Sequence, residues 1–378
     1  MKFSSGSRFN TTFLSKFFTS SLDTRRTDKG NFKHSFHDIL LVVLVGVLCG
    51  IKEYGLIVRF AKSELSWLKK YGDFSNGIPS DETIRRFMIA LDPIAFQDCY
   101  RNWMTSLCNF DGIDTIAIDG KTIRGASTKS NPTSLNPHIL TAWASEQGLA
   151  LGQFRVHDKS NEITAIPELL KLVFIKGSII TIDAMGCQKD IVSTIMDRGG
   201  DYIIAVKGNQ KSLYQAVKDT ALLETPDDIE VDQCLGNGRV TTRTCKVYHN
   251  LTHLGHPSDW VGLQSFITVE SEVFCKTTQR TTTEKRCYIS SVKQNAKKCN
   301  TVIRKHWSIE NQLHWHLDVN FQEDASRKRT GHAAENFNII FKSALTLLKK
   351  DNSKRKSIKQ KCFEALINKK YREKILNL

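Results

Sequence analysis

Two short apolar segments of the chain each end in an aspartate. Residues 115–118 (TIAI) lead into Asp119, and residues 178–182 (SIITI) lead into Asp183. Short apolar runs rich in β-branched residues predict buried strands. Because the carboxyl ends of neighbouring parallel strands meet at one edge of a sheet, we expect the two carboxylates to lie close together.

The residues around these segments alternate between strand and helix patterns. This order predicts an α/β fold, in which a mixed sheet carries helices on its faces. Residues from about 225 to 295 are instead rich in alternating Thr, Val and Cys, which indicates a β-rich insertion, and a helical pattern then continues to about residue 350. The predicted strands are 114–119, 138–144, 149–156, 178–182 and 202–206, and the predicted helices between them are 167–173 and 189–198.

The two ends of the chain differ from this central part, which is predicted to span residues 111–350. Residues 1–35 are polar and basic and predict a flexible arm, and residues 36–110 predict a helical N-terminal domain that binds DNA. The tail, residues 351–378, carries nine Lys or Arg against three acids and predicts a basic amphipathic helix. A solvated basic face and a direct DNA contact both account for that charge.

The composition points to a polyanionic partner. The chain has 54 Lys and Arg against 39 Asp and Glu, a formal net charge of +15, which favours nucleic acid or an anionic membrane surface. The most apolar segment, residues 39–51, is too short to span a membrane and predicts a buried helix. The ten cysteines include no C-x-x-C pair, so we expect reduced thiols in a cytoplasmic protein.

A third carboxylate, Glu310, lies far downstream in the string HWSIENQLHW. Two strand-end aspartates and a helical glutamate are the oxygen ligands that suit two Mg²⁺ ions in phosphodiester chemistry. Each residue also has a structural alternative: Asp119 precedes a glycine in a common turn pair, Asp183 can cap a helix, and Glu310 can be an exposed polar residue. Zinc held by His306, Glu310 and His314 is a further alternative, although ligands at i, i+4 and i+8 drift around a helix.

Five longer strings make the interpretation specific. Together they resemble the bacterial insertion-sequence transposases of the DDE type, in particular the group that includes the H-repeat-associated proteins. The resemblance extends from about residue 35 to about residue 345 and includes the helical N-terminal domain. The strings are residues 118–122 (IDGKT), 159–163 (KSNEI), 183–188 (DAMGCQ), 207–210 (KGNQ) and 306–319 (HWxxENxLHWxLDV).

The resemblance implies an RNase H-like catalytic domain with a β-rich insertion between the second aspartate and the glutamate. Asp119, Asp183 and Glu310 then form the metal-binding catalytic triad, with two Mg²⁺ ions that Mn²⁺ can replace. The implied reaction is hydrolysis at the 3′ ends of the transposon, followed by attack of the freed 3′-hydroxyl on target DNA. The implied partners are double-stranded DNA, as terminal inverted repeats and as target, and further copies of the chain in a homo-oligomer.

The string around Glu310 departs from related transposase groups. Those groups often place an arginine four residues before the glutamate and a lysine seven residues after it, where this chain has His306 and Leu317. His306 is expected either to contact a DNA phosphate or to orient Glu310. Trp307 and Trp315 are interpreted as core residues in preference to base-stacking residues.

Further DNA contacts are predicted for polar residues near the expected active edge, with solvent-exposed loop positions as the alternative. These residues are Lys121, Arg124, Lys207 and Asn209. Three acids near Glu310, namely Asp318, Glu323 and Asp324, are expected either to tune the site or to cap helices.

Two other functions fit many of these features. One is a DNA-binding relic that has lost catalysis, and the other is a metal-dependent nuclease without strand transfer. The presence of all three carboxylates in a full-length catalytic region favours an active transposase over the relic. The nuclease would share the same site. Each of these functions places the protein in the cytoplasm, on the nucleoid when it is bound to DNA.

Overall fold

The computed structural model describes residues 13–25, 32–109, 115–127, 136–156, 161–236, 238–351 and 355–376. The chain divides into two compact units. The sheet unit comprises the described parts of Asn109–Lys121 and Ile139–Glu310. The helical unit comprises the described parts of Met1–Cys108, Thr122–His138 and Asn311–Leu378.

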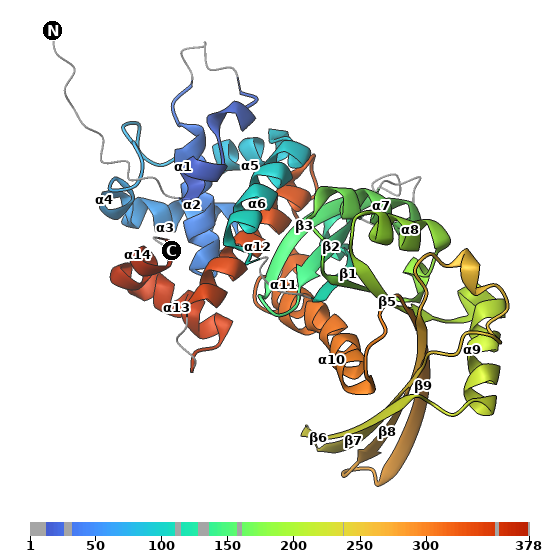
Figure 1. Ribbon diagram of the computed structural model, residues 1–378. Helices are drawn as coiled ribbons and strands as arrows, with labels where there is room; N and C mark the ends of the chain where they lie inside the picture. Colours follow the sequence, from blue (N-terminus) through green and yellow to red (C-terminus); the bar gives the residue numbers. More distant parts are fainter. Residues whose placement is uncertain are drawn as a thin grey trace. The chain divides into compact units, whose positions relative to one another are not determined.

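A nine-stranded mixed sheet is the framework of the sheet unit (Figure 1). Its strand order is β3-β2-β1-β4-β5-β9-β8-β7-β6. Strands β1, β4 and β5 run parallel, whereas β9 pairs antiparallel with β5 and begins an antiparallel extension through β8 and β7 to β6. The bounds are β1 Thr115–Thr122, β2 His138–Ala144, β3 Leu149–Val156, β4 Ile179–Ile182, β5 Asp201–Val206, β6 Asp228–Gly236, β7 Arg239–Tyr248, β8 Ser265–Cys275 and β9 Arg280–Ser290.

Helices pack against this sheet, which confirms the predicted α/β class, with its mixed sheet and its β-rich insertion. Helix α7 packs on β3 and α8, while α10 crosses β4, β5, β6 and β7. Figure 1 shows α9 and α10 on opposite sides of the β6–β9 extension. The helices are α7 Glu162–Leu172, α8 Lys189–Asp197, α9 Lys211–Leu223 and α10 Ala296–His306, with short 3-10 turns η3 Ala184–Gly186, η4 Gly208–Gln210 and η5 Pro257–Asp259.

Helix α7 begins at Glu162, which confirms the expectation that a helix begins there, and it includes the helical pattern predicted at residues 167–173. The side chain of Asn161 caps the helix by accepting a hydrogen bond from the backbone N–H of Thr164, and Pro167 lies inside the helix. Proline has no N–H to donate and is favoured in the first turn of a helix, whereas Pro167 is the sixth residue of α7. The Asn161 cap determines the actual start, and the helix continues through the proline.

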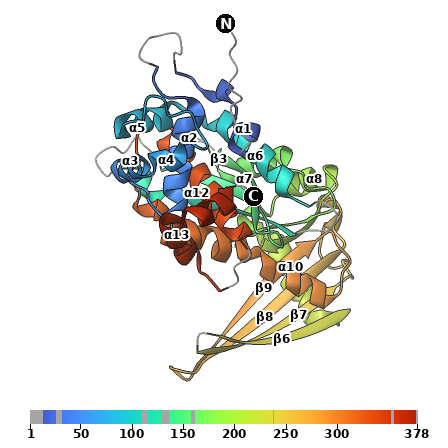
Figure 2. The same cartoon turned by 90° about the vertical axis from the view of Figure 1, so that its left-hand side faces the viewer.

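Helices alone build the helical unit, and α12 is its centre. Helix α12 packs against α2, α5 and α6, and Figure 2 shows it beside α2. Almost every residue of α12 is buried, because other helices pack against it on all of its faces. The described parts of Asn311–Leu378 belong to this unit, whose division from the sheet unit falls at Glu310. The catalytic domain at residues 111–350 stays a prediction. Its elements are α1 Phe13–Phe17, η1 Ser20–Leu22, α2 Phe36–Leu48, α3 Tyr54–Ser63, α4 Leu65–Leu68, α5 Asp81–Ala90, α6 Pro93–Leu107, η2 Arg124–Ala126, α11 Trp315–Val319, η7 Glu323–Ala325, α12 Ala333–Lys350, α13 Ile358–Ile367 and α14 Lys369–Leu376.

Part of the predicted flexible arm is folded. Leu14, Phe18 and Leu22 are buried, and the ring of Phe18 lies 5.3 Å from that of Phe96 in α6. The described residues 13–25 thus differ from the expected loose arm, because three apolar side chains at spacings of four residues anchor them. The predicted buried helix at residues 39–51 is confirmed as α2, whose residues are buried along nearly its whole length.

The basic tail forms two helices, α13 and α14, where one was predicted. Arg372 of α14 is buried, with its guanidinium 2.9 Å from Glu64 and 4.6 Å from the ring centre of Trp67. The ammonium of Lys361 donates to the backbone carbonyls of Leu348 and Asp351. Two of the tail's cations are therefore structural. Others, such as Lys359 and Lys370, are exposed.

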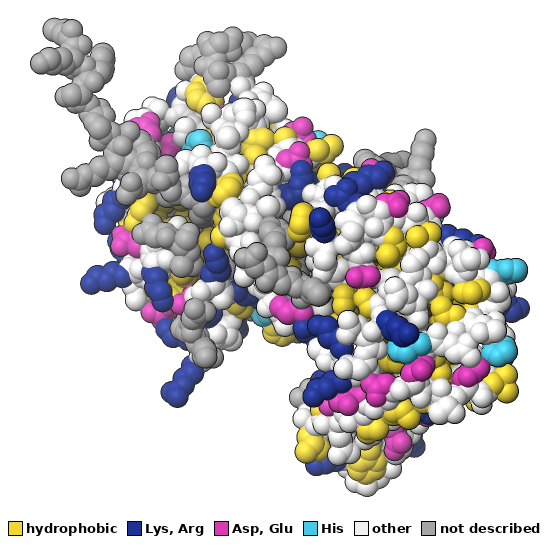
Figure 3. All heavy atoms as spheres, viewed as in Figure 1, with side chains coloured by type: hydrophobic (Ala, Val, Ile, Leu, Met, Phe, Trp, Pro, Cys, Tyr) yellow, Lys and Arg dark blue, Asp and Glu magenta, His cyan; other side chains and the backbone are white. Residues whose placement is uncertain are grey.

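The remaining composition-based predictions concern thiols, membrane segments and charge. All ten cysteines are free, as expected for reduced thiols. Within the described ranges, no helix is long and apolar enough to cross a membrane. On the face shown in Figure 3, Lys and Arg side chains are scattered among acidic and apolar ones. The excess positive charge is not gathered into one patch on that face.

Arg372→Gln is expected to lower the free energy of unfolding by about 3 kcal/mol, because it leaves the largely buried carboxylate of Glu64 without its closest cation. Lys370→Gln removes the same charge from an exposed position of the same helix and should change stability by less than about 0.5 kcal/mol. Urea denaturation measures both variants. Equal effects of the two substitutions would contradict a structural role for Arg372.

Candidate active site

The register of the parallel strands brings the two aspartates together. Ile118 of β1 pairs with Ile182 of β4, so Asp119 and Asp183 are the next residues on two adjacent strands. Both line one cavity of about 230 Å³ in the sheet unit. The expectation that the two carboxylates meet at one edge of the sheet is thereby confirmed.

The structural alternatives proposed for the aspartates have different outcomes. Strand β1 continues to Thr122, so Asp119 lies within a strand and does not begin a turn. Asp183 does cap the η3 turn, because its Oδ1 accepts a hydrogen bond of 3.0 Å from the backbone N–H of Met185. That bond fixes the orientation of the Asp183 carboxylate while the residue still lines the cavity.

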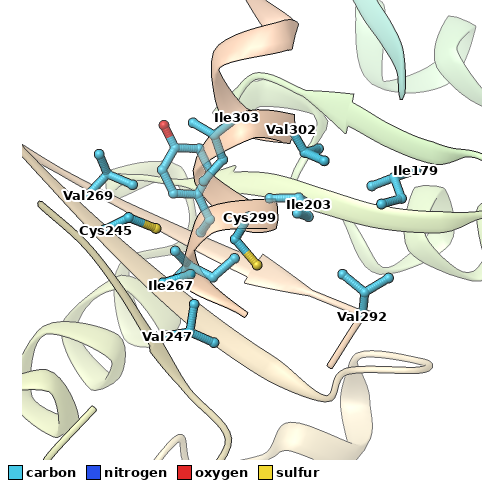
Figure 4. Close-up of a cluster of buried hydrophobic side chains, with 12 residues drawn as sticks. Ile179, Ile203, Cys245, Val247, Ile267, Val269, Val292, Cys299, Val302 and Ile303 are labelled. Carbon is cyan, nitrogen blue, oxygen red and sulfur yellow. The ribbon is translucent and has the colours of Figure 1, made fainter. Parts of the chain in front are cut away.

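The packing of α10 on the sheet places the third carboxylate. Figure 4 shows Cys299, Val302 and Ile303 of α10 within a buried cluster that includes Ile203 and Ile267 of the strands. Residues three or four apart along a helix share one face. His306 and Glu310 extend that face beyond Ile303, and both line the same cavity as the aspartates.

Glu310 begins an irregular segment of this helical path. Residues Glu310–His314 form a π-helical turn, which α11 follows directly. Such turns insert an extra residue into a helix, are rare, and occur frequently at functional sites. The unbroken helical pattern predicted from about residue 300 to 350 is therefore wrong in detail, and residues 320–332 form no α-helix at all.

His306 is held against the sheet. Its Nδ1 forms a hydrogen bond of 3.0 Å with the hydroxyl of Thr181 on β4. Burial lowers the pKa of His306, although the carboxylates of Asp119, Asp183 and Glu310 act in the opposite direction. The imidazole is therefore tied to β4 in the cavity that the three carboxylates line. Among the described residues, the side chains whose ligand atoms come close enough to share one ion include Glu310 but not His306, which disfavours the zinc alternative that used His306.

The carboxylates offer a set of ligands that suits magnesium or manganese. Oxygen atoms of Asp119 and Glu310 come within 4.8 Å of one another, and Asp183 lines the same cavity. Hard divalent cations prefer such oxygen donors, and they commonly share a few carboxylates with substrate phosphates. The residues present therefore fit the ions implied by the sequence.

The residues predicted to contact DNA lie in different places, and only some of them line the cavity. Lys207 lines the cavity together with His306, whereas Lys121, Arg124 and Asn209 are not among its described lining residues. Arg124 belongs to the helical unit, where its exposed side chain approaches Asp324 at 3.7 Å. The amide of Asn209 donates a hydrogen bond of 2.5 Å to the carbonyl of Ala184, next to Asp183.

The structure also shows the contacts and the exposure of acidic and aromatic residues that follow α10. Glu323 is buried and accepts a hydrogen bond of 2.7 Å from Asn338, and Asp324 accepts one from the backbone of Arg124, so both serve contacts within the helical unit. Leu317 is a core residue. Trp307 and Trp315 are 45% and 52% exposed, so their interpretation as core residues was wrong.

Sequence reasoning missed the contribution of β9 to the cavity. Arg286 and Tyr288 line it from the strand that pairs with β5, where Tyr288 lies opposite Ala205. The strand at residues 280–290 could have been predicted from its local sequence. The pairing of that strand with β5 depends on long-range register, for which the local pattern gives no signal.

Comparisons with known proteins agree with the geometry. The family described as "Transposase DDE domain" matches residues 111–347, and the family described as "DDE_Tnp_1-associated" matches residues 16–104. "Putative transposase YncI" of Escherichia coli O157:H7 is 41% identical over 357 residues, which cover 92% of this chain and 90% of that protein. "H repeat-associated putative transposase YhhI" of Escherichia coli K12 is 38% identical over 363 residues, which cover 94% and 95%.

A solved structure is distantly similar. A chain of the cryo-EM structure of a piggyBac transposase synaptic complex with hairpin DNA aligns with 97% of this chain and 81% of its own length. The TM-score is 0.47 and the sequence identity is 11%.

Asn209→Ala is expected to loosen the turn after Asp183, because it removes the hydrogen bond to the carbonyl of Ala184. Mn²⁺-dependent nicking of supercoiled plasmid should fall on the order of tenfold, with unchanged affinity for a labelled DNA duplex in fluorescence anisotropy. Gln215→Ala, on the exposed surface of α9, serves as the control. Weaker duplex binding by the Asn209 variant would instead indicate a direct DNA contact.

Proposed function

Because the chain belongs to the DDE-type transposases of insertion sequences, we propose that it cuts the 3′ ends of its own element and joins the freed 3′-hydroxyls to target DNA. The observation that carries this proposal is the convergence of Asp119, Asp183 and Glu310 on one cavity of the sheet unit. Three separate elements supply these carboxylates, namely β1, the end of β4 and the helical path after α10.

In this proposal, Asp119, Asp183 and Glu310 hold two Mg²⁺ ions, with Mn²⁺ as a substitute. Bound there, such ions would supply positive charge to the phosphodiester and activate the attacking hydroxyl. The side chains of this protein position that chemistry. The backbone N–H of Met185 fixes the Asp183 carboxylate, Thr181 orients His306, and the α10 core fixes the start of the Glu310 segment.

His306 takes the role of a positioning residue in this scheme. A partly buried imidazole that is bonded to Thr181 is poorly suited to contact a DNA phosphate as a cation. It lies on the helix face between Ile303 and Glu310. Its bond to Thr181 therefore fixes the distance between this part of the helical path and β4, and with it the position of Glu310 relative to the aspartates. Of the two roles expected for His306, we therefore favour orientation of Glu310.

The proposed partners follow from the reaction. Double-stranded DNA is both the source of the terminal inverted repeats and the target, and a net charge of +15 favours its binding. The helical N-terminal segment, residues 36–110, is proposed to bind the element's ends, and copies of the chain are proposed to assemble on the two ends. The protein would act in the cytoplasm, on the nucleoid.

Two alternatives make different demands on the site. A DNA-binding relic would need none of the three carboxylates in one place, so their convergence in one cavity favours retained catalysis. A nuclease without strand transfer would use the same cavity. Joining of a DNA end to a second molecule separates the nuclease from the transposase.

Asp119→Asn, Asp183→Asn and Glu310→Gln are each expected to reduce Mn²⁺-dependent nicking of DNA that carries the element's ends by at least about 100-fold, because each removes a charged ligand. Isothermal titration calorimetry should show weaker Mn²⁺ binding in each variant. Asp219→Asn, on the exposed face of α9, is the matched control and should behave like the unmodified protein. Full activity in any triad variant would remove that residue from the triad.

The strand-transfer step has its own measurement. A labelled duplex with an exposed 3′-hydroxyl at the element's end, incubated with supercoiled plasmid and Mn²⁺, should yield plasmid joined to the label. Nicked plasmid without joined label would support the nuclease alternative, and no reaction of either kind would support the relic.

A further inference from the structure

The cavity that holds the three carboxylates also contains two cationic side chains. Lys207 follows β5, and Arg286 comes from β9, the neighbouring strand of the sheet. Anionic DNA must approach three carboxylates to react, so positive charge in the wall of the cavity has a direct use. Arg286 belongs to the β-rich insertion and was absent from the predicted site.

The guanidinium of Arg286 is held in a defined position. It lies 4.9 Å from the ring centre of Trp307, within the range of a cation–π interaction. Its Nε and terminal nitrogen donate to the two carboxylate oxygens of Glu284 at 2.8 and 2.9 Å. The guanidinium holds the pKa of Glu284 below its ordinary value. The side chain of Arg286 remains 32% exposed.

The partner that holds Arg286 is itself open to solvent. The Glu284 side chain is 58% exposed, and it lies two residues before Arg286 on the same face of β9. A carboxylate that accepts two parallel hydrogen bonds from a guanidinium has the same geometry as a phosphate that does so. Glu284 thus accepts the two guanidinium hydrogen bonds of Arg286 that a DNA phosphate would otherwise accept.

Trp307 supports this arrangement from the end of α10. It caps the C-terminal end of α10, directly after His306, and lines the cavity while remaining 45% exposed. An exposed tryptophan at this position has no role in the core. Stacked against Arg286, its ring restricts where the guanidinium can lie.

We propose that Arg286, stacked on Trp307 and assisted by Lys207, forms a phosphodiester-binding subsite of the catalytic cavity, which Glu284 occupies until a DNA phosphate replaces it. The subsite binds a backbone phosphate next to the reacting one. It places positive charge on β9, beside the residue that caps the end of α10. This inference rests on the proposed function of the cavity, but its test needs no catalysis.

The first test is the salt dependence of DNA binding, measured in EDTA with a labelled duplex. Loss of one phosphate contact reduces the slope of log affinity against log salt by about one. Arg286→Gln should show that reduction, with affinity lower on the order of tenfold at low salt. Lys285→Gln removes the same charge from the next residue of β9, which points to the opposite face, and should leave the slope unchanged.

The second test asks whether removing the charge of Glu284 strengthens or weakens DNA binding. Glu284→Gln should tighten DNA binding several-fold, because it releases the guanidinium and removes a competing charge. Glu272→Gln removes an equivalent exposed charge from the other face of the insertion and sets the size of any non-specific gain. A purely structural Glu284–Arg286 pair predicts instead that both partners' variants lose stability and that neither changes the slope.

Thermal unfolding of each variant checks that the fold is intact, and Arg286→Lys, which keeps the charge, should recover part of the slope. An unchanged slope in folded Arg286→Gln would overturn the subsite, as would equal gains in the Glu284 and Glu272 variants. These outcomes are independent of the triad. If the unmodified protein neither nicks nor joins DNA, the proposed function fails while the binding result still decides the subsite.

Discussion

The parallel pairing of β1 with β4 is the constraint on which the rest of the site depends. Ile118 opposite Ile182 puts one aspartate at the same level on each strand. Because successive residues of a strand point to opposite faces, a slip of one residue would turn one carboxylate away from the other. The buried isoleucines therefore do more than fill the core: their packing sets the register, and the register sets the distance between two charged groups that would otherwise repel each other.

The third carboxylate reaches this edge by a different route. Helix α10 is fixed by apolar side chains that contact the parallel strands and the insertion together. The core of the insertion is thus also the support of the helix that leads to Glu310. This arrangement explains why a long insertion between the second aspartate and the glutamate is compatible with a compact site. The insertion continues the same sheet through β9 and supplies part of the surface on which α10 rests.

Local sequence patterns predicted the strands, the aspartates that follow their apolar runs and the distant glutamate, because each has a signal within a few residues. Strand β1 nevertheless continues past Asp119 to Thr122, so only Asp183 lies at the end of its strand. Local patterns did not predict what depends on contacts far along the chain. The π-helical turn at Glu310 lacks a local signal, and the place of Arg286 in the cavity depends on the pairing of β9 with β5. Burial of Arg372 against Trp67 joins residues about 300 positions apart, so the sequence offered only solvent or DNA as the surroundings of the tail's cations. Trp307 is an example of the opposite error. Its aromatic side chain predicted a core residue, but it is exposed in the structure.

The antiparallel extension from β9 to β6 has a consequence for how this protein can vary. Strand β6 ends at Gly236 and β7 begins at Arg239, a turn at residues 276–279 joins β8 to β9, and a longer connection at 249–264 joins β7 to β8. Lengthening any of these connections leaves the pairing of β9 with β5 untouched. Deleting a single residue between Arg286 and the β5-paired end of β9 would reverse the face on which the guanidinium emerges. Length changes in descendants of this element should therefore accumulate at the far ends of the hairpins, while the half of β9 next to β5 keeps its residue count.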